Sequence, residues 1–261
     1  MELSLILVTA FAVALLTLFS GFGLGTLLMP AFALFFSLPV AVAATAVVHL
    51  ANNLFKSALL LRHADRQIVL KFGLPALIAA LPGAALLVAL GHDPSVLQHW
   101  QLGTLQGTVT PLKLTLGLLI LTLAVFESLP ASGRLTVSTR WLPLGGLISG
   151  FLGGLSGHQG ALRAVFLRRL SLDPTRFAAT QAVIALMVDV ARLAIYGASL
   201  QLAWHGAEAV PPLWLALACV AAFAGSTLGR QFLPKMKIEG LRWITAALLA
   251  VAGAGLASGI I

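Results

Sequence analysis

Apolar residues fill most of this chain in long runs, and polar residues collect in the short stretches between the runs. A helix needs about 20 apolar residues to cross the ~30 Å hydrocarbon layer of a bilayer. Runs near this length predict helices at 39–61, 68–90, 112–127, 174–200, 211–232 and 241–260. Two further stretches, 3–37 and 142–170, are apolar hairpins interrupted by glycine. The pattern therefore predicts an all-α polytopic membrane protein.

The two halves of the chain are diverged copies of one another. Residues 20–22 (Ser-Gly-Phe) recur at 149–151, and residues 43–45 (Ala-Ala-Thr) recur at 178–180. Gly25 and Pro39 have their counterparts in Gly160 and Pro174. We predict a first repeat at 1–127, a linker at 128–141 and a second repeat at 142–261, each repeat being a glycine-broken hairpin followed by three transmembrane helices. Such a duplication is typical of membrane transporters.

The charge distribution indicates a bilayer as partner and gives no support for nucleic acid. The chain is 59% hydrophobic and 9% charged, whereas soluble domains carry about 25% charged residues. The net charge of +8 comes from basic residues that flank the apolar runs, as membrane orientation requires. Of the 16 Lys and Arg residues, 13 lie in or beside four loops: Arg62, Arg66, Lys71, Arg134, Arg140, Arg163, Arg168, Arg169, Arg176, Arg230, Lys235, Lys237 and Arg242.

The positive-inside rule places these four loops in the cytoplasm. The connections at 91–111 and 200–210 contain no Lys or Arg and are expected outside. The connection after helix 39–61 is then cytoplasmic, whereas its counterpart after helix 174–200 is outside. We therefore predict inverted-topology repeats, a cytoplasmic linker and both termini outside. A parallel duplication with a weak charge bias is the alternative.

The glycine breaks are candidate anion-binding elements. Gly21, Gly23 and Gly25 form the first break, and residues 157–160 form the second: Gly157, His158, Gln159 and Gly160. A helix that begins inside such a break directs free N–H groups and the positive end of its dipole at a bound anion. Irregular backbone at membrane depth survives only beside protein or a water-filled cavity. The alternative is that these glycines only allow close packing of helices.

A polar stripe follows one face of the helix predicted at 39–61. Thr45, His49, Asn52 and Lys56 recur at helical spacing, with Asn53 beside them. Polar residues this deep in a membrane helix face protein or water, so we predict that they line the substrate site. His49 could gate protons. Lys56 either neutralises an anion or snorkels to the cytoplasmic interface.

The helix predicted at 174–200 carries a second polar face. Asp189, Arg192 and Tyr196 share it, and Thr180 and Gln181 occupy the positions that match 45–46 of the first copy. Asp189 and Arg192 are expected to form a buried ion pair that orders the fold. The alternative is a coupling element in which substrate competes for Arg192. Arg163 is either a substrate-binding guanidinium or an interfacial anchor.

Several classes of chemistry find no support. Carboxylates within the predicted spans are scarce, so ligands for Na⁺, Ca²⁺ or a transition metal are lacking. There is no Walker A motif, Cys219 is the only cysteine, and no cofactor is expected. Ser156 and His158 suggest an intramembrane hydrolase only weakly, because side chains two residues apart usually diverge and no nucleophile elbow is present.

The broken segments resemble the TauE/SafE sulfite exporter family of bacterial membrane transporters. The motif Gly21-x-Gly23-x-Gly25-x4-Pro30, the Ala-Ala-Thr triplet at 43–45 and their second-copy echoes carry the resemblance, which covers essentially the whole chain. Val165 stands where the second copy is expected to have proline. The resemblance implies export or exchange of sulfite, organosulfonates or related small anions across the bacterial cytoplasmic membrane, driven by an ion gradient.

We therefore predict a secondary transporter and not an enzyme. Its expected partners are a small anionic substrate, the lipid bilayer and a coupling ion such as a proton, and a homodimer is left open. The predicted substrate-binding residues are the two glycine breaks, the stripe from Thr45 to Lys56, Arg163, Thr180, Gln181 and Arg192. A passive small-anion channel is the main alternative, and an intramembrane enzyme is the next.

Overall fold

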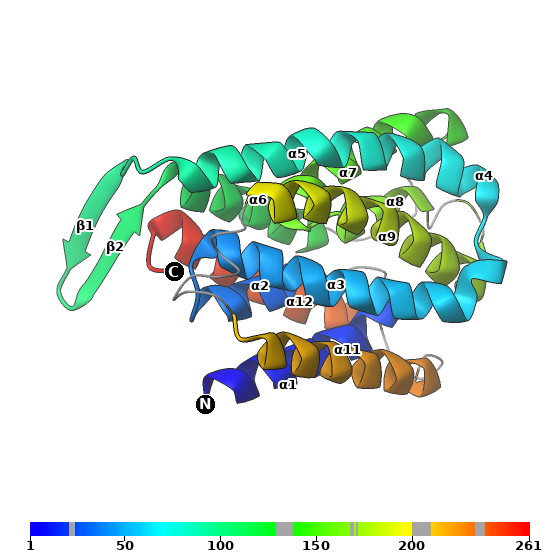
Figure 1. Ribbon diagram of the computed structural model, residues 1–261, viewed down its shortest axis with the longest axis horizontal. Coiled ribbons are helices and arrows are strands. Elements are labelled where there is room, and N and C mark those ends of the chain that lie inside the picture. Colours follow the sequence, from blue (N-terminus) through cyan, green and yellow to red (C-terminus); the bar gives the residue numbers. More distant parts are fainter. Residues whose placement is uncertain (21–23, 129–137, 168–169, 171, 200–209, 233–237) are drawn as a thin grey trace.

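The computed structural model describes residues 1–261 except 21–23, 129–137, 168–169, 171, 200–209 and 233–237. Helices make up almost all of it (Figure 1). In the first half these are α1 (Glu2–Ser20), α2 (Leu24–Ala33), α3 (Leu38–Leu60), α4 (Arg66–Ile68), α5 (Leu74–His92) and α6 (Pro111–Ser128). In the second half they are α7 (Leu142–Ser156), α8 (Gly160–Leu167), α9 (Pro174–Ser199), α11 (Pro212–Phe232) and α12 (Ile238–Ser258).

The predicted helical character is confirmed. Among the described residues, four segments are long and apolar enough to cross a membrane, namely Leu38–His63, Arg66–His92, Pro174–Gly197 and Pro212–Gly229. The second of these runs from α4 into α5 through a π-helical turn at Val69–Gly73. The helix pairs α1–α2 and α7–α8 are separated at the two predicted glycine breaks. Gly21 and Gly23 lie outside the described residues.

The helix starts follow from local chemistry. Pro39 occupies the first turn of α3, where its missing N–H leaves no hydrogen bond unmade. Asp65 caps α4 by accepting hydrogen bonds from the backbone N–H groups of Gln67 (3.0 Å) and Ile68 (3.1 Å). Asp173 caps α9 in the same way, since its carboxylate accepts from Thr175 N and Arg176 N at 3.0 Å each.

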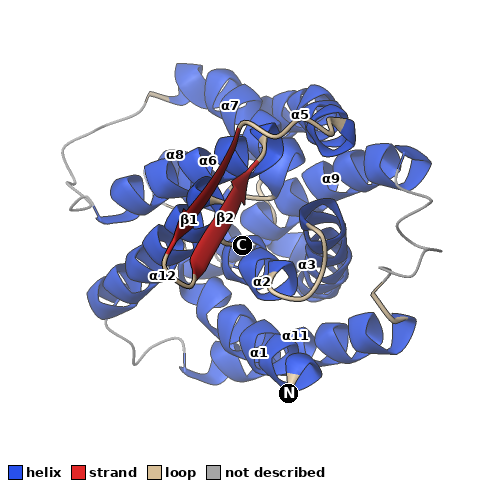
Figure 2. Ribbon diagram, turned by 90° about the vertical axis from the view of Figure 1, so that its left-hand side faces the viewer, coloured by secondary structure: helices blue, strands red, loops and turns tan. Residues whose placement is uncertain are grey.

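A β-hairpin occupies the connection at 91–111, which the sequence pattern presented only as a polar connection. Its antiparallel strands are β1 (Gln98–Leu102) and β2 (Leu105–Val109), and Gly103 turns the chain at a φ of 62°. Trp100 Nε1 donates to the carbonyl of Ser258 at 2.6 Å, and the Thr108 N–H donates to Gly259 O at 3.1 Å. The hairpin is therefore fixed to the end of α12 (Figure 2).

The helices of the two halves exchange partners in a regular way. Helix α5 packs against α7, and its repeat counterpart α11 packs against α1, the counterpart of α7. The remaining matched pairs, α3 with α9 and α6 with α12, pack against each other. Figure 1 shows α3 running away from the hairpin end while α9 runs toward it, and α5 and α11 also run in opposite directions. Each half thus completes the packing of the other.

Glycines set the distance between the exchanged pairs. A Cβ atom on Gly150 or Gly154 of α7 would collide with the backbone of Ala76 or Ala80 on α5, and one on Gly83 would collide with the Phe151 carbonyl. On the matching pair, a Cβ on Gly225 of α11 would collide with the Phe11 carbonyl of α1. The matched glycines at 83 and 225 therefore serve close helix packing.

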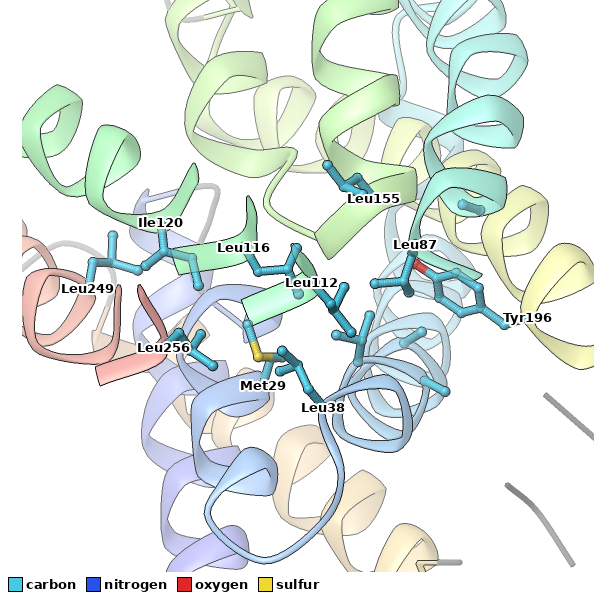
Figure 3. Packing of buried hydrophobic residues seen from close by; sticks show 14 of the residues in the cluster. Met29, Leu38, Leu87, Leu112, Leu116, Ile120, Leu155, Tyr196, Leu249 and Leu256 are labelled. Carbon is cyan, nitrogen blue, oxygen red and sulfur yellow. The ribbon is translucent and has the colours of Figure 1, made fainter. Parts of the chain in front are cut away.

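A buried apolar cluster closes the bundle toward the hairpin end. Leu38 at the start of α3, Leu87 near the end of α5 and Tyr196 near the end of α9 meet there. Figure 3 shows these side chains converging with those of α2, α6 and α12. The polar stripes of α3 and α9 follow this cluster along each helix, in the direction away from the hairpin. The apolar cluster therefore lies between the hairpin end and the polar stripes.

The glycine contacts predict a stability effect that depends on position. Gly150→Ala should lower the free energy of unfolding by about 1–3 kcal/mol, because the methyl group would force α5 and α7 apart. Gly197→Ala on α9 is the matched control, since open space surrounds that position and alanine favours helix by up to about 1 kcal/mol. Thermal unfolding of the purified variants in detergent checks this, and equal midpoints would contradict it.

Candidate functional site

The polar stripes of α3 and α9 meet at the carboxylate of Asp189. His49 Nδ1 lies 2.7 Å from Asp189 Oδ2, and Asn53 Nδ2 donates to the same oxygen at 2.8 Å. His49 and Asn53 belong to the first half and Asp189 to the second, so these contacts join the two repeats. Asp189 has no exposed surface. The sequence pattern predicted both stripes but not this contact between them.

Arg192 holds the second oxygen of the same carboxylate. Its Nη2 lies 2.9 Å from Asp189 Oδ1, and its Nε donates to that oxygen at 3.1 Å. Both side chains are completely buried. The ion pair predicted from their i, i+3 spacing is therefore present, and Tyr196, one turn further along α9, donates its hydroxyl to the carbonyl of Gly154.

Gly25 of the first break lies beside Gly157 of the second, and both lie beside this network. Helix α7 ends at Gly157, whose φ of 82° is readily available only to glycine. A Cβ on Gly25 would lie 2.9 Å from Gly157 O and 3.8 Å from His49 Cδ2. A Cβ on Gly157 would lie 2.5 Å from Arg192 Nη1. The structure thus brings Gly25 of the first break and Gly157 of the second together with His49 and Arg192.

Arg163 of α8 is buried and held by two glutamines. Its Nη1 donates to Gln159 Oε1 at 2.9 Å, and its Nε donates to Gln181 Oε1. A guanidinium can only donate, so both amide oxygens must face it and both amide nitrogens must point elsewhere. Neither Gln159 Nε2 nor Gln181 Nε2 has a hydrogen-bond partner among the described residues, although both are buried.

Three other predicted residues occupy different surroundings. Asn52 Oδ1 accepts from Ser226 of α11 at 2.8 Å, a partner that the sequence did not indicate. Thr180 Oγ1 accepts from the backbone N–H of Asp65 at 2.9 Å and so helps to hold the loop that follows α3. Lys56 is half-buried and has no hydrogen bond or ion pair with the described residues, but the positive charge of Arg163 acts on it.

Ser156 and His158 do lie together, so the expectation that their side chains diverge is wrong. His158 Nδ1 lies 2.9 Å from Ser156 Oγ and 3.0 Å from the Ser156 carbonyl oxygen. The Ser156 hydroxyl donates to Leu152 O at 3.0 Å. Since the serine proton is directed at that carbonyl, Nδ1 acts as the donor and is not a base for the serine. The pair closes the end of α7.

Unpaired hydrogen-bond donors dominate the site. The buried atoms without a partner among the described residues include Asn52 Nδ2, Gln159 Nε2, Gln181 Nε2 and Arg192 Nη1. Leaving a buried donor unmade costs about 1–3 kcal/mol. The only buried carboxylate among the described side chains, Asp189, is already engaged by three residues. The arrangement therefore suits an anion with several acceptor oxygens, and no group of described side chains is arranged to hold a metal ion.

Comparison with known families agrees with this chemistry. The family model described as Sulfite exporter TauE/SafE matches residues 6–256, nearly the whole chain. The chain therefore belongs to this family of membrane transporters, and the resemblance seen in the sequence is confirmed. No curated protein and no solved structure matches it.

The two Arg–Asp pairs among the described residues predict contrasting effects on stability. Arg192→Gln would leave Asp189 buried without its main counter-charge and should lower the free energy of unfolding by about 3–5 kcal/mol. Arg176→Gln is the control, because Arg176 and Asp65 form an exposed pair at 2.8 Å that is worth about 0–1 kcal/mol. Denaturant unfolding of both variants measures the difference. A loss at Arg192 no larger than that at Arg176 would show that the buried pair does not order the fold.

Proposed function

We propose that this TauE/SafE-family protein is a secondary transporter that exports or exchanges small oxyanions, with sulfite and organosulfonates as its substrate class, across the bacterial cytoplasmic membrane. The observation that carries the proposal is the set of buried donors around Arg163 and Arg192 that lack acceptors. A sulfite or sulfonate group offers three oxygens at short range, and each can accept more than one hydrogen bond. Family membership supports the same class of substrate.

The charge of the site favours an anion over a cation. Arg163, Arg192 and Lys56 supply three positive charges around the breaks, against the single carboxylate of Asp189. Cations within a low-dielectric bundle repel one another strongly, so the site gains stability when a further negative charge enters. Gln159 and Gln181 hold Arg163 in place and present two amide N–H₂ groups beside it.

Inverted repeats are the arrangement that we propose for the transport cycle. The opposite directions of α3 and α9, and of α5 and α11, support it (Figure 1). Both termini lie at the hairpin end, and the Arg176–Asp65 ion pair brings two of the basic loops together at the other end. We infer that the hairpin and both termini are outside and that the basic end is cytoplasmic.

The apolar layer favours a carrier over a channel. A channel needs a continuous aqueous path, whereas Leu38, Leu87 and Tyr196 belong to one buried apolar cluster (Figure 3), toward the ends of α3, α5 and α9 that lie nearer the hairpin (Figure 1). Alternating access would open this layer when the helices of one repeat move against those of the other. The passive channel remains the second candidate, and transport kinetics separate the two because a channel shows no counterflow.

Replacing one amide tests the site and the substrate class together. Gln181→Glu keeps an oxygen for Arg163 but replaces the free N–H₂ group with a second oxygen, so the fold should persist while sulfite binding falls tenfold or more, roughly the loss of one buried contact of about 1–3 kcal/mol. Gln101→Glu on the exposed hairpin is the control. Binding to purified protein and counterflow in liposomes are the measurements.

Wild-type protein should show saturable, trans-stimulated sulfite flux in the same liposomes. Unchanged sulfite binding by the Gln181→Glu variant would show that the Gln181 amide does not contact the substrate. Anion flux without trans-stimulation would show that the protein is a channel and not a carrier.

Cysteine labelling tests the orientation. In a Cys219→Ala background, a cysteine at Ser95 beside the hairpin should react with an impermeant reagent from outside. A cysteine at Ser138, just before α7, should react only after permeabilisation. Both native side chains are exposed, so access to the reagent is not limited by burial. Labelling of both positions from the same side would refute inverted repeats.

A further inference from the structure

We propose that the His49–Asp189 pair is a proton-binding site and that its proton is carried together with the anion. This inference rests on the proposed function and names its coupling ion. It concerns the contact between the repeats, which is separate from the donor cluster around Arg163.

The distances require a proton between the two side chains. His49 Nδ1 and Asp189 Oδ2 are 2.7 Å apart, which is a hydrogen-bond distance and would be repulsive between two bare lone pairs. Asn53 Nδ2 lies 2.8 Å from Oδ2 and 3.0 Å from Nδ1. It donates to the carboxylate and holds both partners in place. One proton is therefore already shared by the pair, and the ring has a second nitrogen that can take another.

Access to the pair is one-sided. The Asp189 side chain has no exposed surface, whereas 10% of the His49 side chain is exposed. The ring edge that carries Cδ2 faces Gly25, next to Gly157, so it borders the two glycine breaks. A proton that enters through the site therefore meets the imidazole before the carboxylate.

Protonation changes the partner of Arg192. A proton taken up at His49 Nε2 allows the Nδ1 proton to pass to Asp189 Oδ2, which leaves a neutral ring and a neutral carboxyl group. Arg192 then has no counter-charge, and its Nη1 already lies against Gly157 without a hydrogen-bond partner among the described residues. The site gains one positive charge, and an anion that binds Arg192 neutralises it. Proton and anion therefore stabilise each other's binding.

The surroundings contribute positive charge and no second acid. Helices α2 and α7 contain no ionisable side chain, and His92 lies at the far end of α5, where it is exposed. Cys219 of α11 packs with the apolar residues of α1. Among the described residues, the ionisable groups that interact with the pair include Arg163 on α8 and Arg192 and Tyr196 on α9, and Lys56 on α3 interacts in turn with Arg163.

Proton counting tests the proposal without a variant. Methanesulfonate and isethionate serve as probes, because a sulfonate is the anion of a strong acid and keeps its charge between about pH 5 and pH 9, so a proton taken up on binding goes to the protein. Binding of either probe to purified protein in weak buffer with a pH-indicator dye should take up about one proton per anion. The affinity should fall up to about tenfold per pH unit as the pH rises through the titration of the pair.

Asp189→Asn mimics the protonated carboxyl group. It should bind the sulfonate with no proton uptake and no pH dependence, and liposomes should lose uphill transport driven by a pH gradient. Asp93→Asn, in the exposed connection before the hairpin, is the control and should behave as wild type. Sulfonate binding by wild-type protein without proton uptake, or an unchanged pH dependence in Asp189→Asn, would overturn the inference. Failure of sulfite and both sulfonates to bind would overturn the proposed function, and the inference with it.

Discussion

A single buried carboxylate joins the two halves of this protein. Asp189 accepts from His49 and Asn53 on α3 and from Arg192 on its own helix, and none of its surface is exposed. A charge in so dry a place persists only when it is paired and hydrogen-bonded. The packing of α3 against α9, and with it the position of every other polar group at the centre, therefore depends on these contacts.

Glycines allow backbone segments to approach one another closely around that centre. Where α5 meets α7 and where α1 meets α11, glycines allow the helices to approach until a methyl group would not fit. Gly25 and Gly157 have a different role, because they bring the two breaks against each other beside His49 and Arg192. Glycines therefore serve close helix packing at 83 and 225, whereas those at 25 and 157 lie beside the polar network, where anion binding by the breaks stays a prediction.

Helices, breaks and stripes could be predicted because they arise from local patterns. Apolar run length gave α3 and α9 to within a few residues, and the i, i+3 spacing gave the Asp189–Arg192 pair. The His49–Asp189 contact could not be predicted, because the two residues are 140 positions apart and their pairing depends on how the repeats dock. The β-hairpin was missed because both strands have only five residues, β1 is mostly exposed, and the sequence lacks the alternation of apolar and polar residues that marks a half-buried sheet.

The carboxylate also bears on how an empty carrier could change conformation. Arg163 and Arg192 without an anion would leave unpaired positive charge inside an apolar bundle, which is costly in a medium of low dielectric constant. Asp189 supplies the missing negative charge from within the chain, so that Arg192 remains paired when the site is empty. In the proposed cycle an arriving oxyanion becomes the counter-charge of Arg192 in place of Asp189. The proton shared with His49 then neutralises the Asp189 carboxylate. A fixed internal anion thus lets loaded and empty sites have similar net charge, which is the condition for both to cross the same apolar barrier.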